Sequence, residues 1–360
     1  MSVGPRHDSG SFTDPERGRG RMERALVIGG TRFIGRHLVA ELLDHDYQVT
    51  LFNRGNHDNP FEDREGVNHV EADHVEVDHV QGDRTNESAL EAAAMTVEPD
   101  AVFDMVAYKP QEVRAATEIF SDVDAYVYVS SGDAYGAEHV PKREGETPLE
   151  PCSEAQALDD SPETYGARKA EGDRAVFAAT EGGVPAMSVR PCIVYGPYDY
   201  TERVDYWIHR VANHDRVVVP GDGDLLWHRA FVEDVAAALR IVAEEGTPGE
   251  AYNVGDRRLV TLEEMVELIA EVANTDVEVV TAGARELAAA DLEPGAFPLY
   301  REYPHVLDTS KLASLGWEST PLGEAMEITV EESLESDRDG RENGPPRDAE
   351  ERVLGVLDTL

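Results

Sequence analysis

The sequence predicts an α/β protein, in which a doubly wound parallel sheet is joined to a smaller C-terminal α/β domain. Two observations support this prediction. From Arg24 onward, short β-rich runs alternate with segments whose apolar residues recur at helical spacing. A glycine-rich turn, "GGTRFIG" at residues 29–35, joins the first such run to the first helical segment. Strands that alternate with helices in this way form a parallel sheet covered on both faces.

The elements follow in chain order. Residues 25–30 predict the first strand, and a helix is expected over residues 33–46, where Ile34, Leu38 and Leu42 share one face. A further helix is expected at residues 164–180. The next strands are expected at residues 48–53, 101–107, 125–131 and 186–191.

The two ends of the chain differ from this alternating pattern. Residues 1–22 are polar and rich in Gly and Arg, which predicts a disordered tail. Near the other end, residues 261–274 predict an amphipathic helix that opens with a capping box of Thr261 and Glu264. Residues 336–360 predict an acidic tail: the charged run at residues 337–352 is expected to be solvated, whereas the closing "VLGVLDTL" could dock on the fold.

Charge and composition restrict the classes of partner. The 360 residues carry a formal charge of −41 and only four lysines. Such a surface repels itself at low salt, which favours a salt-rich cytoplasm as the protein's environment. It argues against a nucleic acid backbone or an anionic membrane as partner, since both require clustered cations. The sequence shows no signal peptide and no membrane span, and its two cysteines, Cys152 and Cys192, make no disulfide framework.

A repeat, "HVEAD HVEVD HVQGD" at residues 69–83, places three histidines among carboxylates. A metal site is one interpretation of these residue types. A spacing of five, however, suits neither one face of a helix nor one face of a strand. We therefore favour a local duplication at a strand edge, and we predict no metal.

The turn at residues 29–35 is tested against two phosphate-binding patterns. A P-loop requires Lys and then Ser or Thr after its last glycine, where this chain has Arg36 and His37. The dinucleotide pattern of the Rossmann fold fits better, with Gly29 and Gly30 at the turn and Gly35 at the helix packing position. The alternative is a glycine turn that binds no ligand.

Arg32 stands where that pattern expects a glycine close to the pyrophosphate. Its guanidinium can reach a phosphate while the helix N-terminus supplies backbone donors, so the arginine modifies the turn without excluding a dinucleotide. After the second strand the chain has Asn53 and Arg54, and no acid for a ribose 2′-hydroxyl. An arginine suits a 2′-phosphate, so NADP is modestly favoured over NAD, although Arg54 could also be an ordinary surface residue.

Tyr165 and Lys169 lie four residues apart on a predicted helix and therefore share a face. A strand upstream ends in Ser130 and Ser131. A tyrosine is a poor base at neutral pH, but a nearby ammonium and an oxidised nicotinamide both favour the phenolate and lower its pKa. The combination predicts a tyrosine base, a lysine that activates it, and a serine that holds the reacting oxygen.

From about Arg24 to Leu334 the chain resembles the extended short-chain dehydrogenases/reductases, the family of NAD-dependent epimerases and dehydratases that act on nucleotide sugars. "GGTRFIG" resembles the family's TGGxGFIG turn, and "VSSGDAYG", "TYGARK", "RPCIVYGP" and "HRAFVEDVA" resemble its later motifs in family order. The resemblance implies Ser131, Tyr165 and Lys169 as catalytic residues. It implies a substrate-phosphate contact for Arg229.

The same resemblance implies the cofactor-binding residues: an adenine contact at Asp83, the strand end at Ala107 and the loop at Pro191. Together with the turn and the second strand, the expected set is Gly29, Gly30, Thr31, Arg32, Phe33, Ile34, Gly35, Asn53, Arg54, Asp83, Arg84, Ala107, Lys169 and Pro191. The resemblance further implies an NAD(P)-binding Rossmann domain (residues 23–188 plus 229–256), a substrate domain (residues 189–228 plus 257–335) and a homodimer. The missing signal peptide and membrane span predict a cytoplasmic protein.

The implied reaction is a transient oxidation of a sugar hydroxyl, as in UDP-glucose 4-epimerase. A dehydratase additionally needs an Asp–Glu pair after the serine, where this chain has Gly132 and Asp133. Dehydration is therefore disfavoured, although Asp133 could contact the substrate as an acid. Two alternatives stay open: a NADP-dependent reductase of another carbonyl compound, and a non-catalytic RNA-binding protein like the chloroplast stem-loop-binding branch. Trp207 and Trp227 either line the substrate pocket or fill the core of the smaller domain.

Overall fold

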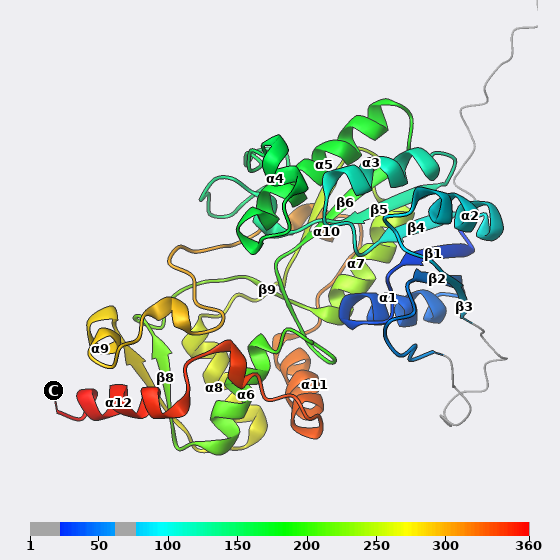
Figure 1. Ribbon diagram of the computed structural model, residues 1–360. Helices are drawn as coiled ribbons and strands as arrows, with labels where there is room; N and C mark the ends of the chain where they lie inside the picture. The colour runs from blue at the N-terminus through cyan, green and yellow to red at the C-terminus, as the bar shows by residue number, and fades with distance from the viewer. Residues whose placement is uncertain (1–21, 62–76, 360) are drawn as a thin grey trace, which may run out of the picture.

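A computed structural model describes residues 22–61 and 77–359 (Figure 1). The predicted tail at residues 1–22 therefore lies almost wholly outside the described residues, as does most of the repeat at residues 69–83. No helix in the described part of the chain is long and apolar enough to cross a membrane.

The centre of the fold is a parallel seven-stranded sheet with the order β10-β6-β5-β4-β1-β2-β3. The order reverses between β1 and β4, as in a doubly wound sheet. The predicted fold class is therefore confirmed. The strands are β1 (Arg24–Ile28), β2 (Gln48–Asn53), β3 (Asp78–Gln81), β4 (Ala101–Asp104), β5 (Ala125–Val129), β6 (Ala186–Pro191) and β10 (Ala251–Val254).

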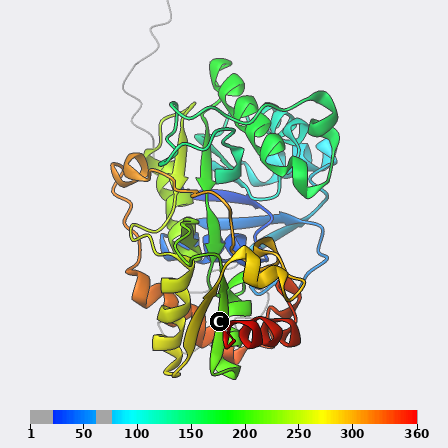
Figure 2. The same cartoon turned by 90° about the vertical axis from the view of Figure 1, so that its left-hand side faces the viewer.

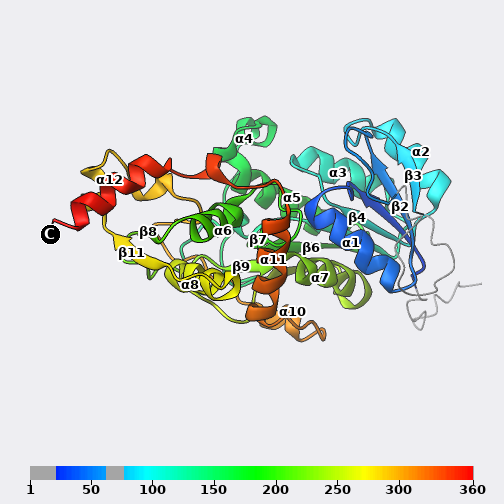
Figure 3. The ribbon, with the colours of Figure 1, turned by 90° about the horizontal axis from the view of Figure 1, so that it is seen from below.

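Helices cover both faces of this sheet, as Figures 1 and 3 show. One face is covered by α1 (Phe33–Asp44) and α7 (Val232–Glu245), which pack against each other. The other face is covered by α2 (Glu87–Val97), α3 (Pro110–Ile119) and α5 (Tyr165–Glu181), with the short α4 (Glu154–Leu158) beside α5. Because apolar helices lie on both sides, every residue of β4, β5, β6 and β10 is buried.

A second part of the molecule is built from later segments (Figures 1 and 2). Its two small parallel sheets pair β8 (Arg216–Pro220) with β11 (Glu278–Ala282), and β7 (Ile193–Tyr195) with β9 (Arg229–Phe231). Helix α8 carries the predicted capping box of Thr261 and Glu264. The helices here are α6 (Arg203–Asn213), α8 (Leu262–Ala273), α9 (Ala284–Ala288), α11 (Leu322–Glu335) and α12 (Arg347–Leu357). The short α10 (Ser310–Ala313) packs instead on β10 of the large sheet.

The C-terminal segment differs in part from the tail predicted over residues 336–360. Residues 347–357 form α12, which packs on α9 and β8 and buries Val353 and Leu354. The Glu350 carboxylate of α12 is fully buried and lies 2.5 Å from Nε of Arg210 on α6. The solvation predicted for residues 337–352 was wrong where α12 begins, because the many charges there belong to an amphipathic helix whose buried acid has a cation partner. The apolar residues from Val353 onward do dock, as the sequence allowed.

The proposed domain limits differ from the strand pairing in two places. Strand β6 runs three residues past the predicted limit at residue 188 and stays in the large sheet to Pro191. Strand β9, assigned to the cofactor domain, pairs with β7. The division into cofactor and substrate domains therefore needs these adjustments and stays a proposal.

Candidate active site

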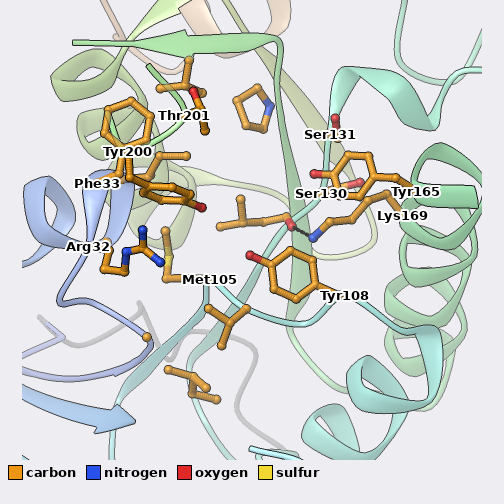
Figure 4. A pocket seen from close by; sticks show the side chains of 18 of the residues that line it. Arg32, Phe33, Met105, Tyr108, Ser130, Ser131, Tyr165, Lys169, Tyr200 and Thr201 are labelled. Carbon is orange, nitrogen blue, oxygen red and sulfur yellow. Dashed lines mark hydrogen bonds between the residues drawn. The ribbon is translucent and has the colours of Figure 1, made fainter. Parts of the chain in front are cut away.

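A cavity of about 860 Å³ opens at the carboxyl ends of the central strands, where Ile28, Asn53, Met105 and Val129 line it (Figure 4). This is the point at which the strand order reverses between β1 and β4. In open α/β sheets such a switch point leaves a crevice in which ligands bind. The cavity also receives side chains from α5 and from the segment between β7 and α6.

The glycine turn forms one wall of this cavity. Gly29 and Gly30 have φ values of +114° and +96°, which side chains other than glycine rarely adopt. A Cβ on Gly30 would lie 2.5 Å from Cδ2 of Leu51, and one on Gly35 would lie 2.7 Å from Cα of Gly30. The glycines therefore let α1 approach β1 closely. The other predicted turn residues also line the cavity: Thr31, Arg32, Phe33 and Ile34.

Arg32 immediately precedes α1, and its guanidinium stacks 3.7 Å from the ring centroid of Tyr200. Tyr200 also makes an edge contact with Phe33. Among the described residues, no carboxylate lies within ion-pair distance of Arg32. The arginine thus adds an uncompensated cation to the wall of the cavity, beside the start of a helix, and both features favour an anion.

Four predicted residues line the far end of the cavity, next to β2 and β3: Asn53, Arg54, Asp83 and Arg84. Asp83 accepts hydrogen bonds from the backbone N–H and the hydroxyl of Thr85, and these bonds lower the pKa of its carboxyl. Both Nη atoms of Arg84 are occupied, because one pairs with the buried Asp104 and the other donates to the carbonyl of Glu112. Arg84 therefore shapes this end of the cavity and holds the end of β4.

The predicted catalytic residues meet in the same cavity (Figure 4). Ser131 follows β5, while Tyr165 and Lys169 lie one turn apart at the start of α5. Nζ of Lys169 donates to the carbonyls of Ala107 (2.9 Å) and Val129 (2.7 Å) and lies 5.8 Å from the Tyr165 ring centroid. Burial lowers the pKa of Lys169 to about 8.

The expected lowering of the tyrosine pKa is not what these contacts produce. Burial, and to a smaller extent the Asp133 carboxylate, raise the pKa of Tyr165 above its ordinary value, while a hydrogen bond with Ser131 opposes the rise. The physical reason is that a phenolate loses its hydration when buried, and the single ammonium of Lys169 does not offset that loss.

These residues fit a dinucleotide. The glycine cradle lets backbone donors approach a pyrophosphate, and Arg32 adds a cation beside them. Ser130 Oγ is buried at the cavity wall and has no hydrogen-bond partner in the described part of the chain. A buried hydroxyl without a partner is costly, which indicates that a ligand group completes its bonding.

The substrate end of the cavity is lined by Asp133, Trp227 and His305. Arg301 donates to Asp133 over 3.3 Å and lies over the Trp227 ring. Burial lowers the pKa of His305 to about 3, so this imidazole is neutral at physiological pH. The two tryptophans are thereby distinguished: Trp227 lines the cavity, whereas Trp207 is fully buried and donates to the carbonyl of Pro298.

The structure does not bring every predicted residue to the cavity lining. Pro191 lines it, but Ala107 contributes only the carbonyl that accepts from Lys169. The assignment of Arg229 to the substrate is corrected, because its buried guanidinium donates to the carbonyls of Val260 (2.6 Å) and Thr261 (3.4 Å). A buried cation needs acceptors, and the backbone before α8 supplies them.

Several lining residues were not named in the sequence analysis. Met105 and Tyr108 belong to the strand end that was expected beside the cofactor at Ala107, whereas Tyr200, Thr201 and Arg203 had no signal. The "DYTER" segment at residues 199–203 follows the "VYGP" motif, and this position is what could have indicated three of them. No group of three or more His, Cys, Asp or Glu that could hold a metal occurs within residues 22–61 and 77–359. The absence of a metal stays a prediction.

The doubly wound sheet, the glycine cradle and the Ser–Tyr–Lys cluster define a Rossmann enzyme that uses a dinucleotide. The chain belongs to the NAD dependent epimerase/dehydratase family, whose sequence model matches residues 25–255. The predicted family is confirmed, and relatives and solved structures resemble the chain over most of its length.

Two relatives illustrate the breadth of the family. The Low-salt glycan biosynthesis protein Agl12 of Haloferax volcanii is 28% identical over 315 residues, which are 81% of this chain and 92% of Agl12. The chloroplast stem-loop binding protein of 41 kDa b of Arabidopsis thaliana is 26% identical over 69% of this chain and 63% of its own length.

Solved structures share the fold. The UDP-glucose 4-epimerase of Thermotoga maritima, solved with UDP-glucose, superposes with a TM-score of 0.66 at 23% identity, covering 87% of this chain and 99% of its own. The dTDP-glucose 4,6-dehydratase of Bacillus anthracis, solved in complex with NAD, gives a TM-score of 0.68 at 21% identity, covering 89% and 99%.

Proposed function

We propose that this protein is a nucleotide-sugar epimerase of the UDP-glucose 4-epimerase type. The observation that carries the proposal is that Ser131, Tyr165 and Lys169 line the same cavity as the glycine cradle. The proteins similar to this chain include a UDP-glucose 4-epimerase and dTDP-glucose dehydratases, and the substrates in their names are nucleotide sugars. A nucleotide sugar is therefore the substrate class that we propose.

In the proposed reaction the phenolate oxygen of Tyr165 accepts a proton from a sugar hydroxyl. Ser131, which lines the same cavity as Tyr165, holds the same hydroxyl in reach. Lys169 supplies positive charge beside the tyrosine, which favours the phenolate. A bound nicotinamide dinucleotide supplies the acceptor for the hydride that leaves the sugar carbon. Tyr165 returns the proton when the oxidation is reversed.

The two residues after Ser131, Gly132 and Asp133, favour epimerisation over dehydration. Loss of water from the sugar needs one group that removes a proton and another that protonates the leaving hydroxyl. Here Gly132 occupies the position before Asp133, and the Asp133 carboxylate is engaged by Arg301. One carboxylate of the usual pair is thus missing.

The first test is turnover. We expect the purified protein to convert UDP-glucose or dTDP-glucose into its C4 epimer, observed by ¹H NMR. Tyr165→Phe should lower kcat by about 10²- to 10⁴-fold, the contribution typical of a general acid–base residue. Its affinity for the dinucleotide should change little, because the removed hydroxyl belongs to the reacting end of the cavity. A 4-keto-6-deoxy product would instead show a dehydratase, and an unaltered rate for Tyr165→Phe would contradict the assigned base.

The finer cofactor proposal is NADP, supported by Arg54. This residue lines the cavity after β2, where the chain has no acid for a ribose 2′-hydroxyl. Arg54→Asp should weaken NADP binding by about tenfold or more and strengthen NAD binding, because a carboxylate repels a 2′-phosphate and accepts from a hydroxyl. Binding is measured by calorimetry with both dinucleotides. If the wild-type protein releases NAD on denaturation, identified by mass spectrometry, the preference for NADP is wrong.

The remaining predictions concern the protein's surroundings. We propose a homodimer in the cytoplasm of a salt-rich cell, with no nucleic acid partner, on the basis of the family resemblance and the charge of −41. Light scattering in molar KCl tests the dimer, and a filter-binding assay with stem-loop RNA tests the excluded partner.

A further inference from the structure

Three arginines of the active-site cavity have no acidic partner in the described part of the chain, although another, Arg84, pairs with Asp104. Arg32, Arg54 and Arg203 line the cavity, and none lies within ion-pair distance of a carboxylate among the described residues. In a chain with 73 acidic and 32 basic side chains, three such cations in one cavity favour an anionic ligand. Arg32 belongs to the glycine turn and Arg54 to the far end of the dinucleotide wall. Arg203 has no assigned role.

Arg203 is the first residue of α6 and is held by a short chain of hydrogen bonds. Asp199, which is 2% exposed, accepts from the backbone N–H (2.9 Å) and the hydroxyl (2.6 Å) of Thr201. The Thr201 hydroxyl accepts from Nε of Arg203 (3.1 Å). Only Nε is used, so the two Nη atoms of this half-buried arginine have no partner within the described residues.

Arg203 comes from the second part of the molecule, where helix α6 packs on α8 and α11. The ring of Tyr200, three residues before it, faces Arg32 and Phe33 of the glycine turn (Figure 4). The dinucleotide wall therefore has its own cation in Arg32, whereas Arg203 is a second cation supplied by a different part of the chain.

A comparison with Arg229 supports a ligand-binding role for Arg203. The family resemblance gives the substrate phosphate to Arg229, but its guanidinium is buried against the carbonyls of Val260 and Thr261. Arg203 instead offers two unpartnered Nη groups at the cavity wall. A planar guanidinium with free donors suits a phosphate oxygen pair.

We propose that Arg203, positioned by Thr201 and Asp199, binds the diphosphate of the substrate in place of Arg229. This inference rests on the proposed function, because it takes a nucleoside diphosphate sugar as the substrate. It makes the "DYTER" segment part of the substrate site and leaves Arg229 a structural residue.

The test measures UDP and NAD(P) binding separately by calorimetry, at one fixed KCl concentration. Arg203→Gln should raise the Kd of UDP by about tenfold or more, the effect of losing a charge-assisted bond. The Kd of the dinucleotide should stay within about twofold. Thr201→Val should weaken UDP binding less, because it loosens Arg203 without removing its charge.

Arg36→Gln is the matched control. Arg36 also stacks on a tyrosine, Tyr198, and also lacks a carboxylate partner among the described residues, but it lies outside the cavity lining. Its replacement changes the net charge equally and should leave UDP binding unchanged. Equal losses in both glutamine variants would reduce the effect to long-range charge and overturn the proposal.

Three further outcomes separate this inference from the proposed function. If the wild-type protein binds UDP and Arg203→Gln binds it equally well, the inference alone fails. If Arg203→Gln weakens the dinucleotide as strongly as UDP, Arg203 belongs to the cofactor and the inference again fails. If the wild-type protein binds the dinucleotide but neither UDP nor dTDP, the nucleotide-sugar substrate fails first and the inference with it.

Discussion

Lys169 is a single residue that serves both the active site and the stability of the sheet. Its ammonium is buried and bridges the carbonyls of Ala107 and Val129, which follow β4 and end β5. A charge that is buried with carbonyl partners but without a carboxylate pays a desolvation cost, and this cost lowers the pKa of Lys169 to about 8.

The lowered pKa gives a testable pH dependence of stability. Between pH 8 and 10.5 the unfolded lysine keeps a proton that the folded one has lost, so stability rises with pH. Relative to Lys169→Met, the wild-type free energy of unfolding should rise by about 3 kcal/mol across that window, as the pKa difference requires. Urea denaturation of both proteins measures it. A difference that stays constant with pH would contradict the buried ammonium.

Single residues show how far the sequence analysis reached. The positions of Tyr165, Lys169 and the glycines followed from spacing, because one helical turn and one tight turn impose local geometry. Arg229 was assigned to the substrate from the family resemblance, but its guanidinium donates to buried carbonyls, and no local signal shows which way an arginine turns. Arg203 was missed for the same reason.

Helix α12 shows the effect of a buried charge at the scale of an element. Glu350 lies 2.5 Å from Nε of Arg210, accepts from the hydroxyl of Tyr206 and is also contacted by Arg347. Because this carboxylate is fully buried, salt in the solvent screens its contacts much less than those of surface pairs.

Removing this charge should unfold the C-terminal region more easily. Glu350→Gln leaves Arg210 buried without its counter-charge and should lower the free energy of unfolding by about 3 kcal/mol. Glu351→Gln is the control, because its pair with Arg347 spans 3.4 Å and its side chain is 64% exposed, and it should cost at most about 1 kcal/mol. Chemical denaturation measures both, and equal effects would contradict a structural role for the buried pair.

Most elements of the sheet were predictable because period and turn chemistry are local signals. The strands at residues 48–53 and 186–191 were found with the same limits. Helix α12 was not, because its polar sequence hides the apolar side formed by Ala349, Val353 and Leu354. The stability of that helix depends on its contact with α6, which is distant in sequence. Composition alone does not predict such a contact.

The charge of −41 affects the whole molecule. Repulsion among surface carboxylates opposes the compact state and is screened when the Debye length falls to about 3 Å in molar salt. We expect Tm to rise by about 10 °C or more between about 0.1 M and 2 M KCl, since about 2 °C corresponds to 1 kcal/mol at this size. Differential scanning calorimetry measures this rise.

A charge variant provides the control for this salt dependence. Glu91, Glu118 and Glu327 are exposed and belong to no ion pair in the described part of the chain. Replacing all three with Lys adds two charges each and changes the net charge from −41 to −35. The variant should gain less Tm from KCl than the wild-type protein does. An equal gain in Tm would mean that KCl stabilises the protein by strengthening hydrophobic burial and not by screening the surface charges.

The order of the strands has a consequence for synthesis on the ribosome. Strand β6 is complete at Pro191, but its outer neighbour β10 ends at Val254, and helix α7, which covers the sheet beside both, lies between them in the chain. During translation the glycine turn is made early. Strand β6, however, has no partner on its outer side until some sixty further residues have been made. An unpaired buried strand is a template for association. Nascent chains of this protein are therefore most prone to aggregate after β6 and before β10 has been synthesised. A chain that is truncated between these two strands keeps β6 as an unpaired edge.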